Sequence, residues 1–372
     1  MRRRDYLAAL GVGISGAFAG CTGETGGDGD TGSSSTSATD VATDDHRGEE
    51  VALEDAPNGV HVPNHTTAMT MEGMQRDGDF QFSAMISAPE VFYFIEGTEV
   101  VPSELLDELN VHVMASVWDP ETETPLPETG LSVEVLDADG AAVTQEVIYP
   151  MLSQRMGFHY GSNLALPGPG EYTVRVSVGG VNIGRTRGFA GRFGSPASVD
   201  IPMSFTESKR EQFTQSEPEG AGQAGALSPM GMGMRPTGSL PAPEELSGTV
   251  LGQAMTDDAR LIGGVVTETA LGGDQPYLYV SPRTPYNRFP LPSMGIEATV
   301  AGAGDGESRQ LSRQLDPELG YHYGVAIPDT AAQALTAGEA DLRVTPSLPP
   351  QVTRHAGYQT AFIEMDAVTI GR

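Results

Sequence analysis

Alternating and β-branched segments, each bounded by turn residues, run through the chain after Val51. They predict strands over Phe80–Ile86, Val111–Trp118, Leu131–Val135 and Tyr172–Val178. Clusters of Gly, Pro and Asp separate such segments at intervals of roughly ten residues, and long helical periods are rare. This pattern predicts an all-β fold built from antiparallel β-sandwiches of immunoglobulin-like type.

Two segments depart from the strand pattern and predict short helices. The first is Pro102–Asp107, where Ser103 is placed to cap the helix N-terminus, and the second is Thr330–Leu335. Both are too short to change the predicted fold class.

A short motif occurs twice and divides the chain. Phe158–Gly161 reads Phe-His-Tyr-Gly, and Tyr321–Gly324 reads Tyr-His-Tyr-Gly. A Pro-Leu-Pro stretch precedes each copy by about thirty residues, and a Gly-Glu turn follows each copy. A shared order of features at matched spacing indicates a duplicated domain. We therefore predict a first sandwich over residues 51–205 and a second, degenerate copy over residues 247–372.

Residues 206–246, between the two copies, are rich in Gly, Pro, Ser and Glu and include the methionine run Met230–Met234. This composition predicts a flexible linker. Low complexity accounts for the methionines in the simplest interpretation. Transient capture of Cu(I) is the alternative, because thioethers are ligands for soft cations.

Residues 1–21 have the features of an export signal. An arginine-rich head, Met1–Arg4, precedes an apolar run over Leu7–Phe18, which is too short to span a bilayer as a helix. Paired arginines favour the twin-arginine route. Cys21, the only cysteine of the chain, follows Ala-Gly as in the lipobox of lipoproteins, so we predict lipid attachment there rather than a chance free thiol. For the polar residues 22–50 we predict a disordered acidic tether.

The charge balance of the chain is strongly acidic. Asp and Glu number 50 against 21 Lys and Arg, which gives a formal net charge of −29. Nucleic acid is therefore not an expected partner, because no basic surface exists to neutralise its phosphates. Dense carboxylates are typical of halophilic proteins, and collection of cations by this surface is the alternative. No nucleophile elbow, P-loop or dinucleotide-binding fingerprint occurs, so we predict that the protein is not an enzyme.

Histidine and methionine carry the candidate chemistry, with 7 His and 15 Met in the chain. His61 and His65 precede Met69 and Met71, whose two-residue spacing places both on one face of a strand. Imidazole with thioether suits copper, and imidazole with carboxylate suits harder divalent ions. The group is interpreted either as metal ligands, with His65 and Met71 as candidates, or as an edge strand whose methionines fill gaps in the core.

A second group surrounds the first copy of the motif. His112 and Met114 also lie two residues apart on a predicted strand, and Met151 precedes His159 by eight residues. The recurrence of the motif and the methionine companions favour metal binding by these four residues over burial of isolated histidines.

The surroundings of this group resemble a known family. The segments Tyr149–Ser153, Gly157–Asn163 and Leu166–Val174 are similar to the pattern of the periplasmic iron-transport-associated proteins. Those proteins are immunoglobulin-like sandwiches that bind copper or iron beside an iron permease. The resemblance implies that Met151 and His159 are metal ligands.

Further positions follow from the same resemblance. It implies that His112 is the early-strand histidine of the pattern, with Met114 where the family usually has glutamate. It also implies that Met71 corresponds to a methionine near the metal. The pattern has one later histidine, which is missing around Arg185–Phe189 in the first domain and matched by His355 in the second.

The second domain departs from the pattern elsewhere. Asp274–Pro276 stands where its early-strand histidine would be, so this domain keeps only His322 and His355. The sequence thus predicts one metal site in the first domain and a degenerate copy in the second. The alternative for the motif is a structural corner, in which the aromatic residues pack between the sheets and the histidine bonds a backbone carbonyl.

Together these features predict an exported transition-metal-binding protein, with copper or iron as the ion, that assists metal uptake on the extracellular face of the cell membrane. The expected partners are the membrane, through the lipid anchor, an iron permease and a second copy of the chain in a homodimer. A structural or interaction module of the cell surface without metal binding is the alternative function.

Overall fold

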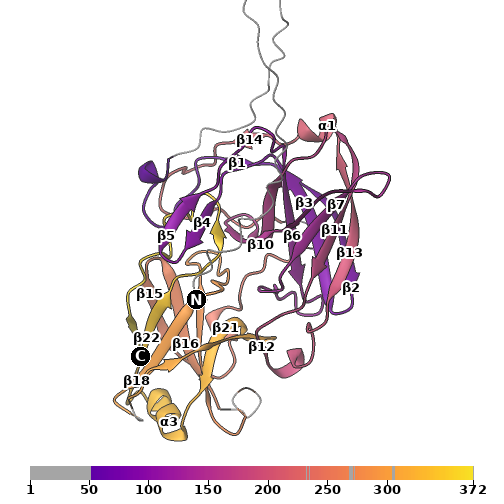
Figure 1. The fold of residues 1–372 in the computed structure, drawn as a ribbon. Helices are drawn as coiled ribbons and strands as arrows, with labels where there is room; N and C mark the ends of the chain where they lie inside the picture. Colours follow the sequence, from indigo (N-terminus) through magenta and orange to yellow (C-terminus); the bar gives the residue numbers. More distant parts are fainter. Residues whose placement is uncertain are drawn as a thin grey trace, which may run out of the picture. The chain divides into compact units, whose positions relative to one another are not determined.

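The computed structural model describes residues 52–231, 233, 235–267, 271, 273–303 and 306–371, which belong to one compact unit. The predicted export signal, Cys21 and the tether lie outside the described residues. Within the described part, strands dominate and pack as two β-sandwiches (Figure 1). The predicted all-β fold class is confirmed.

The first sandwich consists of a large and a small sheet. The large sheet has the order β2 (Met69–Asp77), β3 (Phe80–Ser87), β6 (Val111–Trp118), β10 (Gly157–Leu164), β9 (Tyr149–Ser153), β23 (Thr353–Arg354), β4 (Tyr93–Glu96) and β5 (Glu99–Pro102). The small sheet has the order β13 (Ala197–Phe205), β11 (Gly170–Val178), β7 (Ser132–Leu136) and β8 (Ala142–Val147). Alternate residues of facing strands, such as Val113, Tyr160 and Val174, fill the core between them.

The second sandwich repeats this arrangement. Its large sheet has the order β12 (Gly184–Arg185), β20 (Ser312–Asp316), β21 (Gly320–Ala326), β17 (Tyr277–Arg283), β16 (Ala259–Val266) and β15 (Thr249–Thr256). Its small sheet has the order β19 (Arg309–Gln310), β18 (Gly295–Ala301), β22 (Asp341–Leu348) and β24 (Val368–Ile370). The strand order β15-β16-β17-β21-β20 matches the order β2-β3-β6-β10-β9 in the first sandwich. We interpret this match as the result of a domain duplication.

The two sandwiches exchange short strands. β12 leaves the first sandwich and pairs in parallel with β20 of the second, whereas β23 leaves the second and pairs in parallel with β9 of the first. In Figure 1 the yellow β23 segment accordingly lies among the indigo and magenta strands of the first sandwich. β12 follows β11, which is the first strand after the motif in the first sandwich, and β23 follows β22, which has the same place in the second. The exchange is therefore reciprocal, and each large sheet is completed by the other half of the chain.

The predicted linker, residues 206–246, packs on the first sandwich over part of its length. It contains α1 (Glu207–Arg210), η3 (Pro243–Glu245) and β14 (Gln215–Ser216), which pairs with β1 (Thr66–Thr67). Arg235 is buried and donates to Ser116 Oγ at 3.1 Å and to the carbonyl of Met156 at 2.7 Å. The segment thus connects the sandwiches in sequence and also covers the outer face of the first large sheet.

The helix predictions had different outcomes. Thr330–Leu335 lies within α3 (Asp329–Ala337), which confirms that helix. The helix predicted over Pro102–Asp107 is wrong: Pro102 ends β5, and Ser103 pairs with Phe92 through its amide and its hydroxyl instead of capping a helix. Two further short helices are η1 (Leu53–Asp55) and η2 (Arg187–Phe189). Among the described residues, no helix combines the length and the apolar character needed to cross a membrane.

Candidate metal centre

Three histidines from distant parts of the chain meet on the outer face of the first large sheet. His112 is on β6, His159 is on β10, and His355 follows β23. On β10, Phe158 and Tyr160 point into the sandwich core, so His159 between them points outward. One ring nitrogen of each histidine lies within 4.8 Å of the corresponding nitrogens of the other two, and all three side chains are buried.

Each imidazole is oriented through its Nδ1 atom. The acceptors are Asn163 Oδ1 for His112 at 2.9 Å, the Gly157 carbonyl for His159 at 3.1 Å, and Glu90 Oε2 for His355 at 3.3 Å. Because each acceptor is an oxygen, each Nδ1 carries the hydrogen and each Nε2 presents a lone pair. All three Nε2 atoms are buried and have no hydrogen-bond partner. Three unpaired acceptors facing one another match the requirements of a metal ion that three imidazoles ligate.

Burial keeps the imidazoles of His112 and His159 neutral. Burial, with the charge of the nearby His355 as the second cause, lowers the pKa of His112 from 6.5 to about 4. Burial, followed by the charge of His355, also holds the pKa of His159 well below its ordinary value. Neutral rings are the form that binds metal.

Glu90 supplies the negative charge of the cluster. Burial alone would raise the pKa of this carboxyl, but the hydrogen bond and the charge of His355 outweigh burial and lower it to about 2. Its backbone is tied to Asn163, whose amide group donates to the Glu90 carbonyl at 2.8 Å. Glu90 therefore orients His355 directly, and Asn163, to which it is tied, orients His112, as carboxylates and amides do around metal-bound imidazoles.

Met151 places a sulfur beside the histidines. It pairs with His159 across β9 and β10 and is fully buried. A Cβ added to Gly161 would lie 2.9 Å from the Met151 sulfur and 3.0 Å from His112 Nε2. Glycine at this position thus leaves room for both donor atoms on the same spot of the sheet, and Met151 is placed to be a fourth ligand.

The strand exchange brings His355 into this cluster. The amide of His355 donates to the carbonyl of Leu152 on β9 at 3.0 Å, directly after the parallel pair of β23 and β9. The sequence grouped His355 with His322 in the second domain, whereas the structure places it with His112 and His159. His355 therefore supplies the later histidine that the first domain lacks, and His322 stays apart in the second sandwich.

The remaining predicted residues lie around the cluster or apart from it. A cavity of about 60 Å³ is lined by the three histidines and by His65 and Met114. Met71 lies farther along the same face and packs against a group of methionines that includes Met114. His322 is on β21 in the second sandwich.

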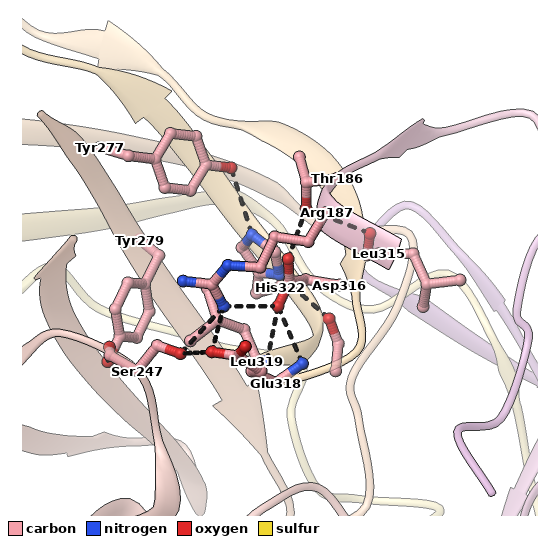
Figure 2. Close-up of polar contacts among 11 residues, drawn as sticks. Thr186, Arg187, Ser247, Tyr277, Tyr279, Leu315, Asp316, Glu318, Leu319 and His322 are labelled. Carbon is pink, nitrogen blue, oxygen red and sulfur yellow. Dashed lines mark hydrogen bonds and ion pairs between the residues drawn. The ribbon is translucent and has the colours of Figure 1, made fainter. Parts of the chain in front are cut away.

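His322 occupies the counterpart of the His159 position, with different surroundings (Figure 2). Strand registers place Tyr277 at the position of His112, and Gln314 at the position of Met151. Tyr277, whose hydroxyl pKa is raised by burial, donates to His322 Nε2 at 3.2 Å, and His322 Nδ1 donates to the carbonyl of Gly320 at 3.0 Å. Both ring nitrogens of His322 are therefore engaged, which leaves no lone pair for a metal ion.

An ion pair fills the rest of this second position. Thr186, on the exchanged segment, stands at the counterpart of His355 and donates to Asp316 at 2.7 Å. Arg187 contacts Asp316 at 3.1 Å, Glu318 at 2.5 Å and the hydroxyl of Ser247 at 2.9 Å (Figure 2). A guanidinium thus holds the carboxylates together where the first sandwich presents three free imidazole nitrogens.

The parts of the motif that recur have a structural role in both copies. Tyr160 bonds Thr129 and the Leu126 carbonyl, and Tyr323 bonds the Met294 amide and the Leu291 carbonyl. In both copies the histidine donates to the carbonyl of the glycine two residues earlier, which has a positive φ of +68° at Gly157 and +67° at Gly320. The structural corner is therefore present twice, and the first copy adds unpaired donor atoms to it.

Sequence reasoning missed Glu90 and Asn163. Both act through the histidines that they orient, and neither is a histidine or a methionine, the residue types that carried the candidate chemistry. Asn163 was within the matched segment Gly157–Asn163, so the asparagine of that turn was the available signal. Glu90 lies in Ala88–Val91, a connection with no pattern of its own.

Two family models match separate parts of the chain. Residues 119–185 match the model of a family described as Fe2+ transport protein. The resemblance to iron-transport-associated proteins is thereby confirmed for this segment. Residues 244–371 match a domain of unknown function (DUF7350). None of the curated proteins that were compared matches the chain.

Two kinds of solved structure are similar to part of the chain. FetP of uropathogenic Escherichia coli strain F11 is 17% identical, with 37% of this chain and 97% of FetP covered and a TM-score of 0.29. The copper-reconstituted P19 protein of Campylobacter jejuni is 17% identical, with 37% of this chain and 97% of P19 covered and a TM-score of 0.28.

The donor set itself fits a transition-metal ion. Three imidazoles with one thioether favour copper, and imidazole is also an accepted ligand of iron. The site is closed on the sheet side by Gly161 and open through the cavity toward His65. An ion bound here would keep an open side, as a cargo ion that is later released requires.

Proposed function

We propose that this protein binds a copper or iron ion through His112, His159 and His355, with Met151 as the fourth ligand, and assists metal uptake at the cell surface. It acts as a binding protein and not as a catalyst. The lipid anchor at Cys21 holds it at the extracellular face of the membrane, and the tether lets it deliver the ion to an iron permease. A homodimer is a further part of this proposal.

One observation carries the proposal: three buried Nε2 atoms face one another without a partner. A buried imidazole nitrogen without a hydrogen bond costs stability on the order of 1–3 kcal/mol. Three such atoms in one place are a large cost for a fold that gains nothing from them. A metal ion removes the cost, because it bonds all three lone pairs at once.

The match to the Fe2+ transport protein family supports iron uptake as the setting. The donor atoms favour copper, so the protein either carries copper for a copper-dependent uptake system or binds iron with ligands that also accept copper. The structural alternative, a cell-surface module without metal, is supported by the corner contacts that both motif copies share.

Titration of the purified protein with Cu(II) and Fe(II) separates these functions. We expect one ion per chain, and His112→Ala, His159→Ala and His355→Ala should each weaken binding by at least about 100-fold, the upper end of the effect of outer-shell substitutions. His322→Ala is the matched control and should bind as the wild type does. Absence of binding at micromolar metal, or equal loss in the His322 variant, would exclude the proposed site.

A further inference from the structure

A group of methionines adjoins the histidine cluster on the same outer sheet face. Met85, Met114 and Met156 are buried and pack together, and Met69 and Met71 pack against them. The registers place Met71 opposite Met85, and Met85 opposite Met114, so three thioethers form a row across β2, β3 and β6. We call these five residues the methionine cluster.

The composition of this cluster differs from that of the main core. In the described part of the chain, the main core is built from Val, Leu, Ile, Phe, Tyr and Ala, and Met203 and Met294 are its only buried methionines. The methionine cluster contains no other residue type. If its role were to fill space, branched apolar residues would serve equally well, as they do in the main core. The five methionines therefore gather soft donor atoms at one place on the sheet.

The cluster is connected to the histidines by one cavity. Met69, Met114 and Met156 line the same cavity of about 60 Å³ as His112, His159 and His355. This volume exceeds the roughly 15 Å³ that one water needs, so an ion can pass from one group to the other. Met156 is fixed at the boundary between them, because its carbonyl accepts a hydrogen bond from Arg235 at 2.7 Å.

The charges nearby select for a singly charged ion. Thioethers are neutral donors and offer nothing to balance a divalent ion. The Arg235 guanidinium, which lies beside Met156, repels cations further. A soft monovalent cation is therefore preferred over Fe(II) or Zn(II) at the cluster.

One more methionine, Met230, is held close to the cluster. The amide of Met230 donates to the carbonyl of Arg155 at 2.8 Å, one residue before Met156. Met230 is thus anchored beside the cavity, which Arg155 also lines.

We propose that the methionine cluster is a second metal site, which binds Cu(I) through thioethers alone and is distinct from the histidine site. Met85, Met114 and Met156 are its inner ligands, and Met69 and Met71 lie at its rim. The proposal extends the proposed function, since the cavity allows the ion to move between the two sites, but the cluster binds its ion independently of the histidines.

The test uses Ag(I), a redox-inert probe with the ligand preference of Cu(I), added as silver nitrate to the full chain carrying ¹³C-methyl methionine. We expect Ag(I) to shift the methyl signals of the methionine cluster and to leave those of Met203 and Met294 unchanged. Met85→Leu/Met114→Leu should weaken this binding by at least about tenfold, since thioethers are the only donors there. Met203→Leu/Met294→Leu is the matched control and should bind Ag(I) as the wild type does.

The outcomes separate this site from the histidine site. His159→Ala/His355→Ala should keep the Ag(I)-induced shifts of the cluster, and Met85→Leu/Met114→Leu should keep Cu(II) binding, which also shows that it folds. Shifts confined to Met151, or equal Ag(I) affinity in Met85→Leu/Met114→Leu, would overturn the proposal. If the wild type binds Ag(I) at the cluster but no Cu(II), the methionine site stands and the proposed histidine site fails.

Discussion

The two motif-bearing positions of this protein have the same scaffold and opposite chemistry. Each has a histidine that donates to a glycine carbonyl, a tyrosine that bonds the segment before a strand of the small sheet, and an exchanged segment from the other half of the chain. In the first position three Nε2 atoms are unpaired. In the second, Tyr277 occupies the histidine nitrogen and Arg187 holds the carboxylates (Figure 2).

The difference teaches that the motif alone does not define a metal site. His322 keeps the motif and loses its free lone pair through a single neighbour, Tyr277. His159 keeps its lone pair because the neighbouring strand offers His112 instead, whose own hydrogen goes to Asn163. The ligand set is therefore decided by the strands on either side of the motif.

The largest effect expected of a single substitution on stability concerns the ion pair of the second position. Asp316 is fully buried, so Arg187→Met leaves its charge without its main partner. We expect a loss of unfolding free energy of about 3 kcal/mol, at the low end for a broken buried pair because Thr186 and two amides still bond Asp316. Chemical denaturation measures this loss, and metal affinity should not change. An unchanged free energy of unfolding would show that Arg187 does not hold this position closed.

The two positions should respond alike to acid. The pKa of His112 and that of His322 are each lowered from 6.5 to about 4, chiefly by burial. Between these pH values the unfolded chain binds a proton at each histidine that the native protein does not bind. The stability of the metal-free protein should therefore fall as the pH drops from 6.5 to 4, by about 3 kcal/mol for each histidine.

Denaturation at pH 7 and pH 4.5 checks this expectation. His112→Leu and His322→Leu should each reduce the loss on acidification, and Cu(II) at pH 7 should stabilise the wild type and His322→Leu but not His112→Leu. Wild-type acid sensitivity in both variants would contradict the buried neutral state of these rings.

The motif glycines provide a matched pair of substitutions. A Cβ on Gly161 would meet the Met151 sulfur and the His112 ring, and a Cβ on Gly324 would meet the ring of Tyr277 at 2.1–2.6 Å. Both Gly161→Ala and Gly324→Ala should destabilise the protein by about 2 kcal/mol through overpacking. Only Gly161→Ala should also weaken metal binding, as calorimetric titration would show. Equal metal affinities in the two variants would place the ion away from Gly161.

The smallest effect concerns the orientation of His355. Glu90→Gln keeps an oxygen near His355 but removes the carboxylate charge, so metal affinity should fall by about 10-fold, the low end for an outer-shell partner. The fall should appear in the dissociation constant for Cu(II) without a change in stoichiometry. A substitution in the exposed Glu99 is the control, and a Glu90→Gln variant that matches it would leave Glu90 without a role at the site.

The sequence predicted the strands and the unequal motif copies, because both are local patterns. Val111–Trp118 alternates and is β6, and His112, Met151 and His159 stand in segments similar to a known family pattern. The strand exchange was not predictable in this way, since β23 pairs with β9 across about 200 residues and is too short to have a pattern. For the same reason His355 was assigned to the wrong neighbours.

Local sequence gave the wrong prediction for two other segments. Residues 206–246 look like a linker because Gly and Pro dominate, but Arg235 within them is buried against the first sheet. Ser103 looks like a helix cap, but its hydroxyl accepts the amide of Phe92 in the β4–β5 hairpin. In both cases a distant contact decided the local structure.

Anomalous diffraction from crystals of the full chain grown with Cu(II) tests the central claim most directly. The account predicts one strong peak at bonding distance from the Nε2 atoms of His112, His159 and His355, and none beside His322. A chain with copper elsewhere, or with the three Nε2 atoms bridged by water alone at saturating copper, would contradict it.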